Sequence, residues 1–438
     1  MLLRELARSN LFVVSLDEQG EWYRYHHLFS ELLLYELRSG SPELVPTLRK
    51  RASVWLEGAG FFEGAIRQAI VATDYERVGL LITRHWYAYV SAGQTATVQR
   101  WLELLPEEMI THDTPLCLVE AWICALDGRR EESARFLTLA ESIPYEGPLP
   151  DGTASVDAGA AILRATFGFD GVRSSVEAAR RAAELEPGPT SPRAALVCFA
   201  LGSSLYLSGD LAQARKPLEE ALALTEDDQR LVRVVALSFL SFVATDEGHL
   251  EEAESHARAA RVLVEGLRPC GIPQTSLAPI ALGRALAERG RLEEAEKELE
   301  SALSARRRLP DLSPWPTLIG LLALAPIHAV RGDRAEARTL LAEARTILER
   351  YPDAGIFPEL LERQEGKLRA RRPQEEQLTE RELDVLRLLG GESSVRQIAQ
   401  SLYVAPSTVR TQVKSVYRKL GVSSRKDAVE EAHARGLI

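Results

Sequence analysis

The sequence GRLEEA at residues 290–295 occurs, with small changes, four times along the chain. The other copies are GDLAQA at 209–214, GHLEEA at 248–253 and GDRAEA at 332–337, so successive copies begin 39, 42 and 42 residues apart. This spacing is typical of repeats that consist of two helices. We expect each glycine to end one helix, because glycine adopts the left-handed conformation at low cost. The alanine that closes each copy should lie where two antiparallel helices approach most closely.

Apolar and small residues around two of these turns recur at the spacing of the tetratricopeptide pattern. One set is Leu282, Gly283, Leu286, Ala295, Leu299 and Ala302, and the other is Leu201, Gly202, Leu205, Ala214, Leu218 and Ala221. Weaker copies begin near Gly60, Gly93, Gly128 and Gly171. A single helical pair cannot bury its own apolar face, so such pairs stack into a solenoid. We therefore predict an all-α fold with tetratricopeptide-like helical repeats over residues 39–362.

The composition limits the class of protein. The chain has 438 residues, of which 45% are hydrophobic and 26% are charged, as in ordinary globular proteins. Its longest apolar run, residues 318–330, is shorter than the roughly 18 residues that cross a bilayer. The first residues show no secretory cleavage pattern. We therefore expect a cytoplasmic protein without a membrane partner.

The net charge of −10 argues against a protein that coats nucleic acid with its whole surface, so any DNA contact requires a local basic patch. The four cysteines form no CxxC pair, which favours core packing over a metal or redox role. No catalytic triad, carboxylate pair or phosphate-binding loop stands out. We therefore predict no enzyme, no cofactor and no metal site. The tryptophans of the repeats are expected to pack in the core and not to share a ligand pocket; they are Trp55, Trp86, Trp101, Trp122 and Trp315.

Residues 378–438 have different helix signals. Thr379 followed by Glu382 is a capping box, which predicts a helix start. The first helix should bury Leu383, Leu386 and Leu389, the second should cover about 395–402 with Ile398, Ala399 and Leu402 inward, and the third should start at Pro406. Three short helices in this order are typical of a helix-turn-helix.

The third predicted helix has two different faces. Val409, Val413, Val416 and Leu420 form an apolar stripe, whereas Arg410, Lys414 and Arg418 recur every four residues on another face. Residues 404–426 contain six Lys or Arg and no Asp or Glu. Because solvated helix faces normally mix both signs of charge, this pattern favours an anionic partner.

The C-terminal stretch LTERELDVLRLLGGESSVRQIAQSLYVAPSTVRTQVKSVYRKLGVSSRKDA, residues 378–428, resembles the LuxR-type DNA-binding domain. In that family the third helix enters the major groove of double-stranded DNA. The resemblance implies that Arg410, Thr411 and Lys414 face bases. It places Gln412, where the family often has His, beside them, and it turns Thr408, Arg418 and Lys419 towards phosphates. It also implies a homodimer on DNA that pairs through the last helix, about 425–435, with Val429 and Ala432 as apolar candidates.

This stretch departs from the family at two further positions. Ala405 stands where a capping Ser is usual, and Ser394 stands where Asn is common. Loss of a cap costs about 1 kcal/mol of stability. Neither departure removes the basic face of the third helix.

At the other end, residues 1–38 with NLFVVSLDEQGEWYRYHHLFSELLLYEL resemble the end of a winged helix. Together with the repeats, a charged linker at 363–377 and the domain at 378–438, they follow the order of the large ATP-dependent LuxR-type regulators, the family of the maltose-regulon activator. Those regulators carry a P-loop ATPase before the winged helix, and this sequence contains no GxxxxGK[ST]. Either the gene start is misassigned or the regulator lacks the ATP switch. We expect this chain not to bind ATP tightly.

The sequence thus predicts a DNA-binding transcription regulator whose repeats bind a protein or small-molecule effector. The alternative is a helical-repeat scaffold for protein interactions in which the DNA-binding domain is vestigial. The cations of residues 404–426 favour the regulator, because a vestigial domain has no reason to keep six of them without an acid.

Overall fold

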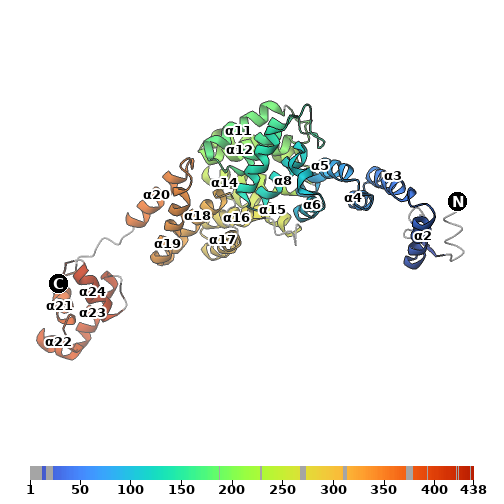
Figure 1. The fold of residues 1–438 in the computed structure, drawn as a ribbon. Helices are drawn as coiled ribbons and strands as arrows, with labels where there is room; N and C mark the ends of the chain where they lie inside the picture. Colours follow the sequence, from blue (N-terminus) through green and yellow to red (C-terminus); the bar gives the residue numbers. More distant parts are fainter. Residues whose placement is uncertain are drawn as a thin grey trace. The chain divides into compact units, whose positions relative to one another are not determined.

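The chain forms two compact units, Met1–Leu361 and Glu362–Ile438, in a computed structural model. The structure describes residues 12–15, 23–186, 188–226, 229–266, 273–308, 313–370, 378–391, 393–420, 422, 424–434 and 436–438, and for Ala370, Arg418 and Ala434 only the backbone. Helices dominate both units (Figure 1), so the predicted all-α class is confirmed. No described helix is long and apolar enough to cross a membrane.

The described N-terminal residues form a small hairpin and a helix. Strands β1 (Val13–Ser15) and β2 (Tyr23–Tyr25) pair in antiparallel fashion, with Val13 opposite Tyr25. Helix α2 (His27–Gly40) follows directly. The Phe12 ring stacks on Phe29 of this helix at 5.0 Å between centroids, which holds the hairpin against α2. A hairpin beside a helix is what the end of a winged helix requires.

Seven helical pairs follow. They are α3 (Leu44–Gly58) with α4 (Phe62–Val71), α5 (Tyr75–Ser91) with α6 (Thr95–Leu102), α8 (Thr114–Leu126) with α9 (Arg130–Ser142), α10 (Val156–Phe167) with α11 (Val172–Leu185), α12 (Ala194–Ser208) with α13 (Leu211–Leu224), α14 (Arg230–Asp246) with α15 (Leu250–Gly266), and α16 (Leu277–Glu288) with α17 (Leu292–Arg307). An eighth pair is α18 (Trp315–Arg331) with α19 (Arg334–Glu349), and the short α7 (Glu107–Thr111) and η1 (Pro273–Ser276) lie between pairs. The predicted repeats are therefore present.

The predicted turn glycines are confirmed. All eight have a positive φ between 78° and 106°: Gly60, Gly93, Gly128, Gly171, Gly209, Gly248, Gly290 and Gly332. Side chains with a Cβ rarely adopt this conformation, which explains why glycine recurs there.

Two helical glycines show why the repeats pack as they do. A Cβ on Gly202 would lie 2.6 Å from Leu218 Cγ and 3.0 Å from the Ala214 carbonyl oxygen. A Cβ on Gly283 would lie at the same distances, 2.6 Å from Leu299 Cγ and 3.0 Å from the Ala295 carbonyl oxygen. The two sequence copies are therefore equivalent in space, and in each pair a missing side chain lets two backbones approach.

The repeats are also connected over long distances in the sequence. Residues 351–356, called here the return segment, follow α19 and lie against the middle repeats, at α11 and α12. Val172 N–H donates to the Asp353 carbonyl at 3.0 Å, and Ile356 N–H donates to the Leu207 carbonyl at 3.1 Å. Arg173 N–H donates to the Asp353 carboxylate at 2.7 Å. The return segment thus ties the end of the solenoid to its middle.

Beyond the return segment, α20 (Phe357–Ala370) contains the first residues of the predicted linker 363–377, and residues 371–377 lie outside the described part. The C-terminal unit then has α21 (Glu380–Leu389), α22 (Val395–Ser401), α23 (Pro406–Leu420) and α24 (Arg425–Ala434). Leu386 and Leu389 are buried as predicted, and Leu383 is half-buried. Val385, which the sequence analysis did not single out, is fully buried against Ile398 and Val409.

The close approach at Gly202 predicts the effect of a single methyl group. Gly202→Ala should lower the free energy of unfolding of the repeats by about 1–3 kcal/mol, because the new Cβ meets Leu218 and a backbone oxygen. Gly58→Ala is the matched control, since nothing lies within 4 Å of a Cβ there. Urea unfolding of the full chain, followed by circular dichroism, compares the two variants. Equal stability would contradict the packing described.

Candidate DNA-binding surface

Helix α23 presents the predicted DNA-contacting residues. Its apolar stripe is confirmed, because Val409 and Val416 are fully buried, Leu420 is nearly so and Val413 is half-buried. Arg410 and Lys414 lie one turn apart and are exposed, and among the described residues neither forms an ion pair. This leaves both cations available to an anionic partner.

The other predicted contacts have different surroundings. Thr408 and Thr411 are exposed, Gln412 is half-buried, and the Thr411 hydroxyl donates to the Ser407 carbonyl at 3.1 Å. Arg418 belongs to α23, but its side chain lies outside the described residues. Exposed hydroxyl groups beside two cations suit contacts to DNA.

Lys419 is held within the domain instead of pointing outward. Its Nζ lies 2.7 Å from Glu382 Oε2, and the two side chains are only 10% and 9% exposed. The Ser415 hydroxyl donates to the other Glu382 oxygen at 2.7 Å. The Thr379 backbone N–H donates to Oε2 at 2.8 Å, which completes the predicted capping box. Glu382 therefore connects the start of α21 to the last turns of α23.

These contacts control the ionisation of Glu382. Burial alone raises the pKa of a carboxyl group, but the donors Lys419, Thr379 and Ser415 outweigh it and lower the pKa of Glu382 from 4.5 to about 2. The carboxylate is thus charged at every physiological pH. Sequence reasoning found the capping role of Glu382 but missed its ion pair, because Lys419 lies 37 positions away.

Arg425 has a second internal role. Its Nε donates to the Leu389 carbonyl at 2.9 Å and an Nη donates to the Gly391 carbonyl at 2.6 Å. These carbonyls end α21 and have no partner within the helix, so Arg425 caps it. Lys426 lies on the exposed side of α24, 3.7 Å from Glu430. The cations of residues 404–426 whose side chains are described therefore divide into those that stabilise the domain and those that face solvent.

The structure of the last helix, α24, shows that one prediction was wrong. Ala432 was expected to pair two protomers, but it is fully buried in a cluster with Leu386, Val416 and Ala428. It therefore belongs to the core of its own domain and offers no surface to a partner. Val429 is half-buried and remains accessible on α24.

The two departures from the family pattern have different consequences. Ser394 acts as a full cap of α22, because it forms a capping box with Gln397. Ala405 has no side-chain oxygen, so its position before α23 offers no such cap. The substitution of Asn by Ser thus preserves the cap, whereas Ala405 does not.

With this geometry established, three family models match the chain. The luxR family of bacterial regulatory proteins matches residues 376–432, the MalT winged helix domain matches 1–45, and the MalT-like TPR region matches 160–381, half of the sequence. The chain belongs to the MalT-like family of LuxR-type regulators. This MalT-like protein is a DNA-binding transcription regulator with a helical-repeat region.

Two solved structures are similar to this chain at low identity. A Rap protein complexed with competence and sporulation factor is 14% identical, with a TM-score of 0.49 over 81% of this chain and 99% of that one. A signal transduction ATPase with numerous domains from Pyrococcus horikoshii, which has a tetratricopeptide repeat sensor, is 15% identical, with a TM-score of 0.46 over 80% of this chain and 58% of that one.

The described N-terminal residues can be compared with the ATP site expected in the larger ATP-dependent regulators. Such a site needs a glycine-rich loop between a strand and a helix, with a lysine on the phosphates. The described strands β1 and β2 pair with each other, and β2 leads into α2 through His26 alone. The sequence contains no P-loop motif. That this chain does not bind ATP tightly stays a prediction.

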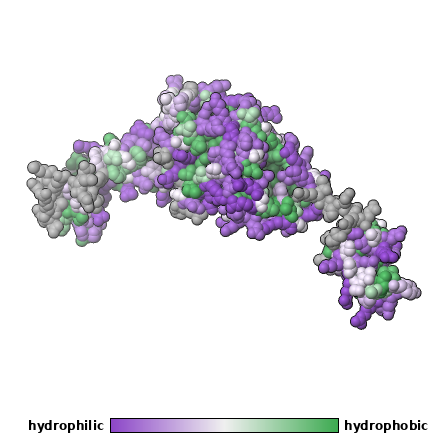
Figure 2. All heavy atoms as spheres, turned by 180° about the vertical axis from the view of Figure 1, so that it is seen from behind, coloured by the Kyte–Doolittle hydropathy of each residue, from purple (hydrophilic) through white to green (hydrophobic). Residues whose placement is uncertain are grey.

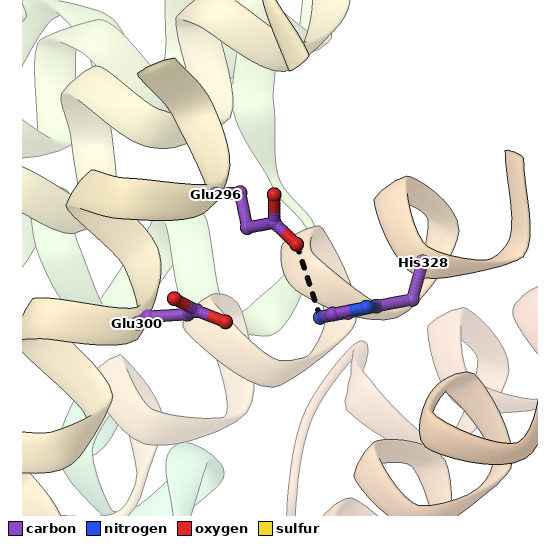
Figure 3. A group of neighbouring side chains, drawn as sticks. All are labelled: Glu296, Glu300 and His328. Carbon is purple, nitrogen blue, oxygen red and sulfur yellow. Dashed lines mark ion pairs between the residues drawn. The ribbon is translucent and has the colours of Figure 1, made fainter. Parts of the chain in front are cut away.

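One group of possible metal ligands lies in the repeats. Figure 3 shows Glu296 and Glu300 on α17 and His328 on α18 as neighbouring side chains. Their ligand atoms all lie within 4.8 Å of one another. His328 Nε2 lies 3.7 Å from Glu296, but Arg331 also pairs with that carboxylate. A guanidinium on the central carboxylate opposes a second cation, so the group is better described as an ion-pair cluster. The expectation of no metal stays a prediction.

The cysteine and tryptophan side chains of the repeats differ in their burial. Cys117 and Cys124 are fully buried, and burial raises the pKa of Cys117 to about 11, which makes its thiol unreactive. Trp101 is buried as predicted, whereas Trp55 is 59% exposed. The remaining three, Trp86, Trp122 and Trp315, are buried as predicted, and they also line one cavity.

The Glu382 ion pair predicts a pH-dependent stability. Glu382→Gln should destabilise the unit 362–438 by roughly 1.5–3 kcal/mol at pH 7, because Lys419 loses its charged acceptor. Since folding lowers the pKa of Glu382, its contribution is complete above about pH 4.5 and is lost as the pH falls towards 2. The difference between wild type and variant should therefore shrink below pH 4.5.

Urea unfolding of this unit at pH 7, 4 and 3 measures the difference. Glu380→Gln, an exposed carboxylate in the same helical turn, is the control and should change stability little. A constant difference at all three pH values would show that folding does not lower the pKa of Glu382.

Proposed function

We propose that α23 reads DNA bases through Arg410, Thr411 and Lys414. The observation that carries this proposal is the pair of exposed, unpaired cations on the side of α23 away from its buried stripe. Arginine and lysine recognise guanine through its two acceptors in the major groove. Gln412 lies at the edge of the same surface and supplies an amide. A vestigial domain would not be expected to keep this arrangement.

Thr408 and Arg418 are proposed to contact phosphates on either side of that surface. Lys419, predicted from the resemblance to face phosphates, is better assigned as a positioning residue, because its charge is already matched by Glu382. Its substitution should act through the orientation of α23. The proposal thus separates contact residues from residues that hold the contact helix in place.

The domain boundaries are proposed at 1–38 for the winged-helix end, 39–362 for the repeats, 363–377 for the linker and 378–438 for the DNA-binding domain. The repeats are proposed to bind an effector, protein or small molecule, which regulates the DNA-binding domain. The matching families are regulatory and repeat families, which supports a cytoplasmic regulator without catalytic activity.

The base-reading role has a direct test. Arg410→Ala and Lys414→Ala should each reduce discrimination between a selected site and scrambled DNA by about 1–3 kcal/mol. Lys426→Ala is the control, because it removes an exposed cation from a different helix. Titrations with the full chain at several salt concentrations give both affinities. Equal losses on both DNAs for all variants would reject the assignment of base contacts.

A homodimer on DNA is proposed to pair through the accessible side of α24. Val429→Asp should weaken binding to a site with two half-sites and leave binding to a single half-site nearly unchanged, because the new charge lies in the apolar interface. Mass measurement of the protein–DNA complex gives the number of protomers. A single protomer on a selected site without repeated halves would exclude the dimer.

A further inference from the structure

A cavity lies inside the repeats and is partly open to solvent. Its lining is mostly apolar with a few polar groups, as is typical of small-molecule sites. Aromatic and aliphatic side chains from α5, α8, α10, α12, α14 and α18 line most of it; among them are Trp86, Trp122, Phe167, Phe199, Phe239 and Trp315. The first helices of successive pairs thus form its wall. The face of the repeats drawn in Figure 2 carries many hydrophilic residues, with apolar patches between them.

One charged group faces this apolar space. Arg306, near the end of α17, lines the cavity and is only 5% exposed. Its Nε donates to the Thr317 hydroxyl at 2.7 Å, an Nη donates to the Ser276 hydroxyl at 3.1 Å, and the other Nη donates to the Ser313 carbonyl. All three acceptors are neutral, and no carboxylate in the described part of the chain pairs with Arg306. Burial without an anion lowers the pKa of Arg306 to about 10, which still leaves it charged at pH 7.

Further polar atoms in the wall also lack partners. Trp315 Nε1 and Ser175 Oγ are buried and have no hydrogen-bond partner among the described residues, and both residues line the cavity. A guanidinium has five N–H donors, of which three are used here. Gln274 Oε1, which is an acceptor, is a further atom in the wall that has no partner in the part of the chain that the structure describes. Buried polar groups without partners are costly in a folded protein, so their presence in one cavity indicates a missing polar partner, and the donors among them suit an acceptor.

We propose that this cavity binds a small molecule with an apolar body and a single carboxylate, which Arg306 neutralises. The inference rests on the proposed effector role of the repeats and names its chemical class. The aromatic wall matches the apolar body of such a ligand, and Trp315 Nε1 offers an additional donor. One guanidinium compensates one negative charge, so a doubly charged phosphate would bury an unmatched charge in an apolar space.

The position of Trp315 connects the cavity to the return segment. Its ring contacts Tyr351 at 5.5 Å and stacks on Phe357, the first residue of α20, at 5.7 Å. A ligand that moves Trp315 therefore changes the packing of the residues that begin the connection to the DNA-binding unit. Binding in the cavity has a physical route to the chain segment that leads to the DNA-binding domain.

Two acid–amide pairs test the ligand class on the full chain: 4-phenylbutyrate with 4-phenylbutyramide, and decanoate with decanamide. Calorimetry and tryptophan fluorescence measure binding, since three tryptophans line the cavity. At least one acid should bind, and its amide should bind roughly 10- to 100-fold more weakly, the effect of losing a hydrogen bond between charged groups. Equal binding of acid and amide, or no binding of either acid, would overturn the proposal.

Variants locate the site. Arg306→Met should reduce the affinity for the acid to that for the amide, whereas Arg338→Met, an exposed arginine of α19, should have no effect. Val235→Phe fills the cavity and keeps Arg306, so it should weaken acid and amide alike and gives a second test if Arg306→Met does not fold. Unchanged binding by Val235→Phe would place the ligand elsewhere.

Asp311 lies outside the described residues and is close in sequence to Ser313. The variant Asp311→Asn tests whether Asp311 is the counter-ion of Arg306 within the protein. If only Asp311→Asn binds the acid, Arg306 is neutralised within the native protein and the proposal is wrong. DNA binding of the same preparations is measured separately. Acid binding can therefore fail while the proposed DNA recognition stands, or the reverse.

Discussion

The architecture of the repeats depends on how closely two helices can approach. At Gly202 and Gly283 the partner leucine occupies the space that a side chain would need, and the nearest backbone oxygen lies 3.0 Å from the absent Cβ. Each pair exposes an apolar face after this contact is made, so it must pack on the next pair. The first helices of the pairs consequently gather on one side, and the aromatic cavity lies there. A local packing constraint thereby produces the space in which an effector is proposed to bind.

The C-terminal unit is under a different constraint. A small domain must expose positive charge to DNA without losing stability to repulsion between its cations. One nearly buried carboxylate, Glu382, accepts hydrogen bonds from a cap, a hydroxyl and an ammonium group. Arg425 is used to close the end of α21. Only Arg410 and Lys414 among the described cations of α23 stay exposed without an ion pair. Charges that maintain the fold and charges that meet DNA are thus separate, although the sequence places them in one basic run.

Sequence patterns predicted the features that depend on neighbouring residues. The turn glycines, the capping box at Thr379, the stripe of Val409 and Val416 and the tetratricopeptide register all follow from spacings of a few positions. The sequence patterns did not predict contacts between residues far apart in the chain, which depend on how successive helices and helical pairs are oriented. These include the cavity shared by Trp86, Trp122 and Trp315, the pairing of Lys419 with Glu382, and the return segment. Ala432 was misassigned because periodicity places it on a face of α24 without showing what covers that face.

The return segment distinguishes these repeats from an open solenoid. In an open array each unit contacts only its neighbours, so units can be gained or lost at either end with little penalty. Here Asp353 bonds to Val172 and Arg173, and Ile356 bonds to Leu207. Insertion or deletion of one helical pair between these residues would displace the whole set of bonds. The bonds of the return segment therefore fix the number of helical pairs between Val172 and Ile356. Evolution can change the surfaces of these pairs more readily than their number.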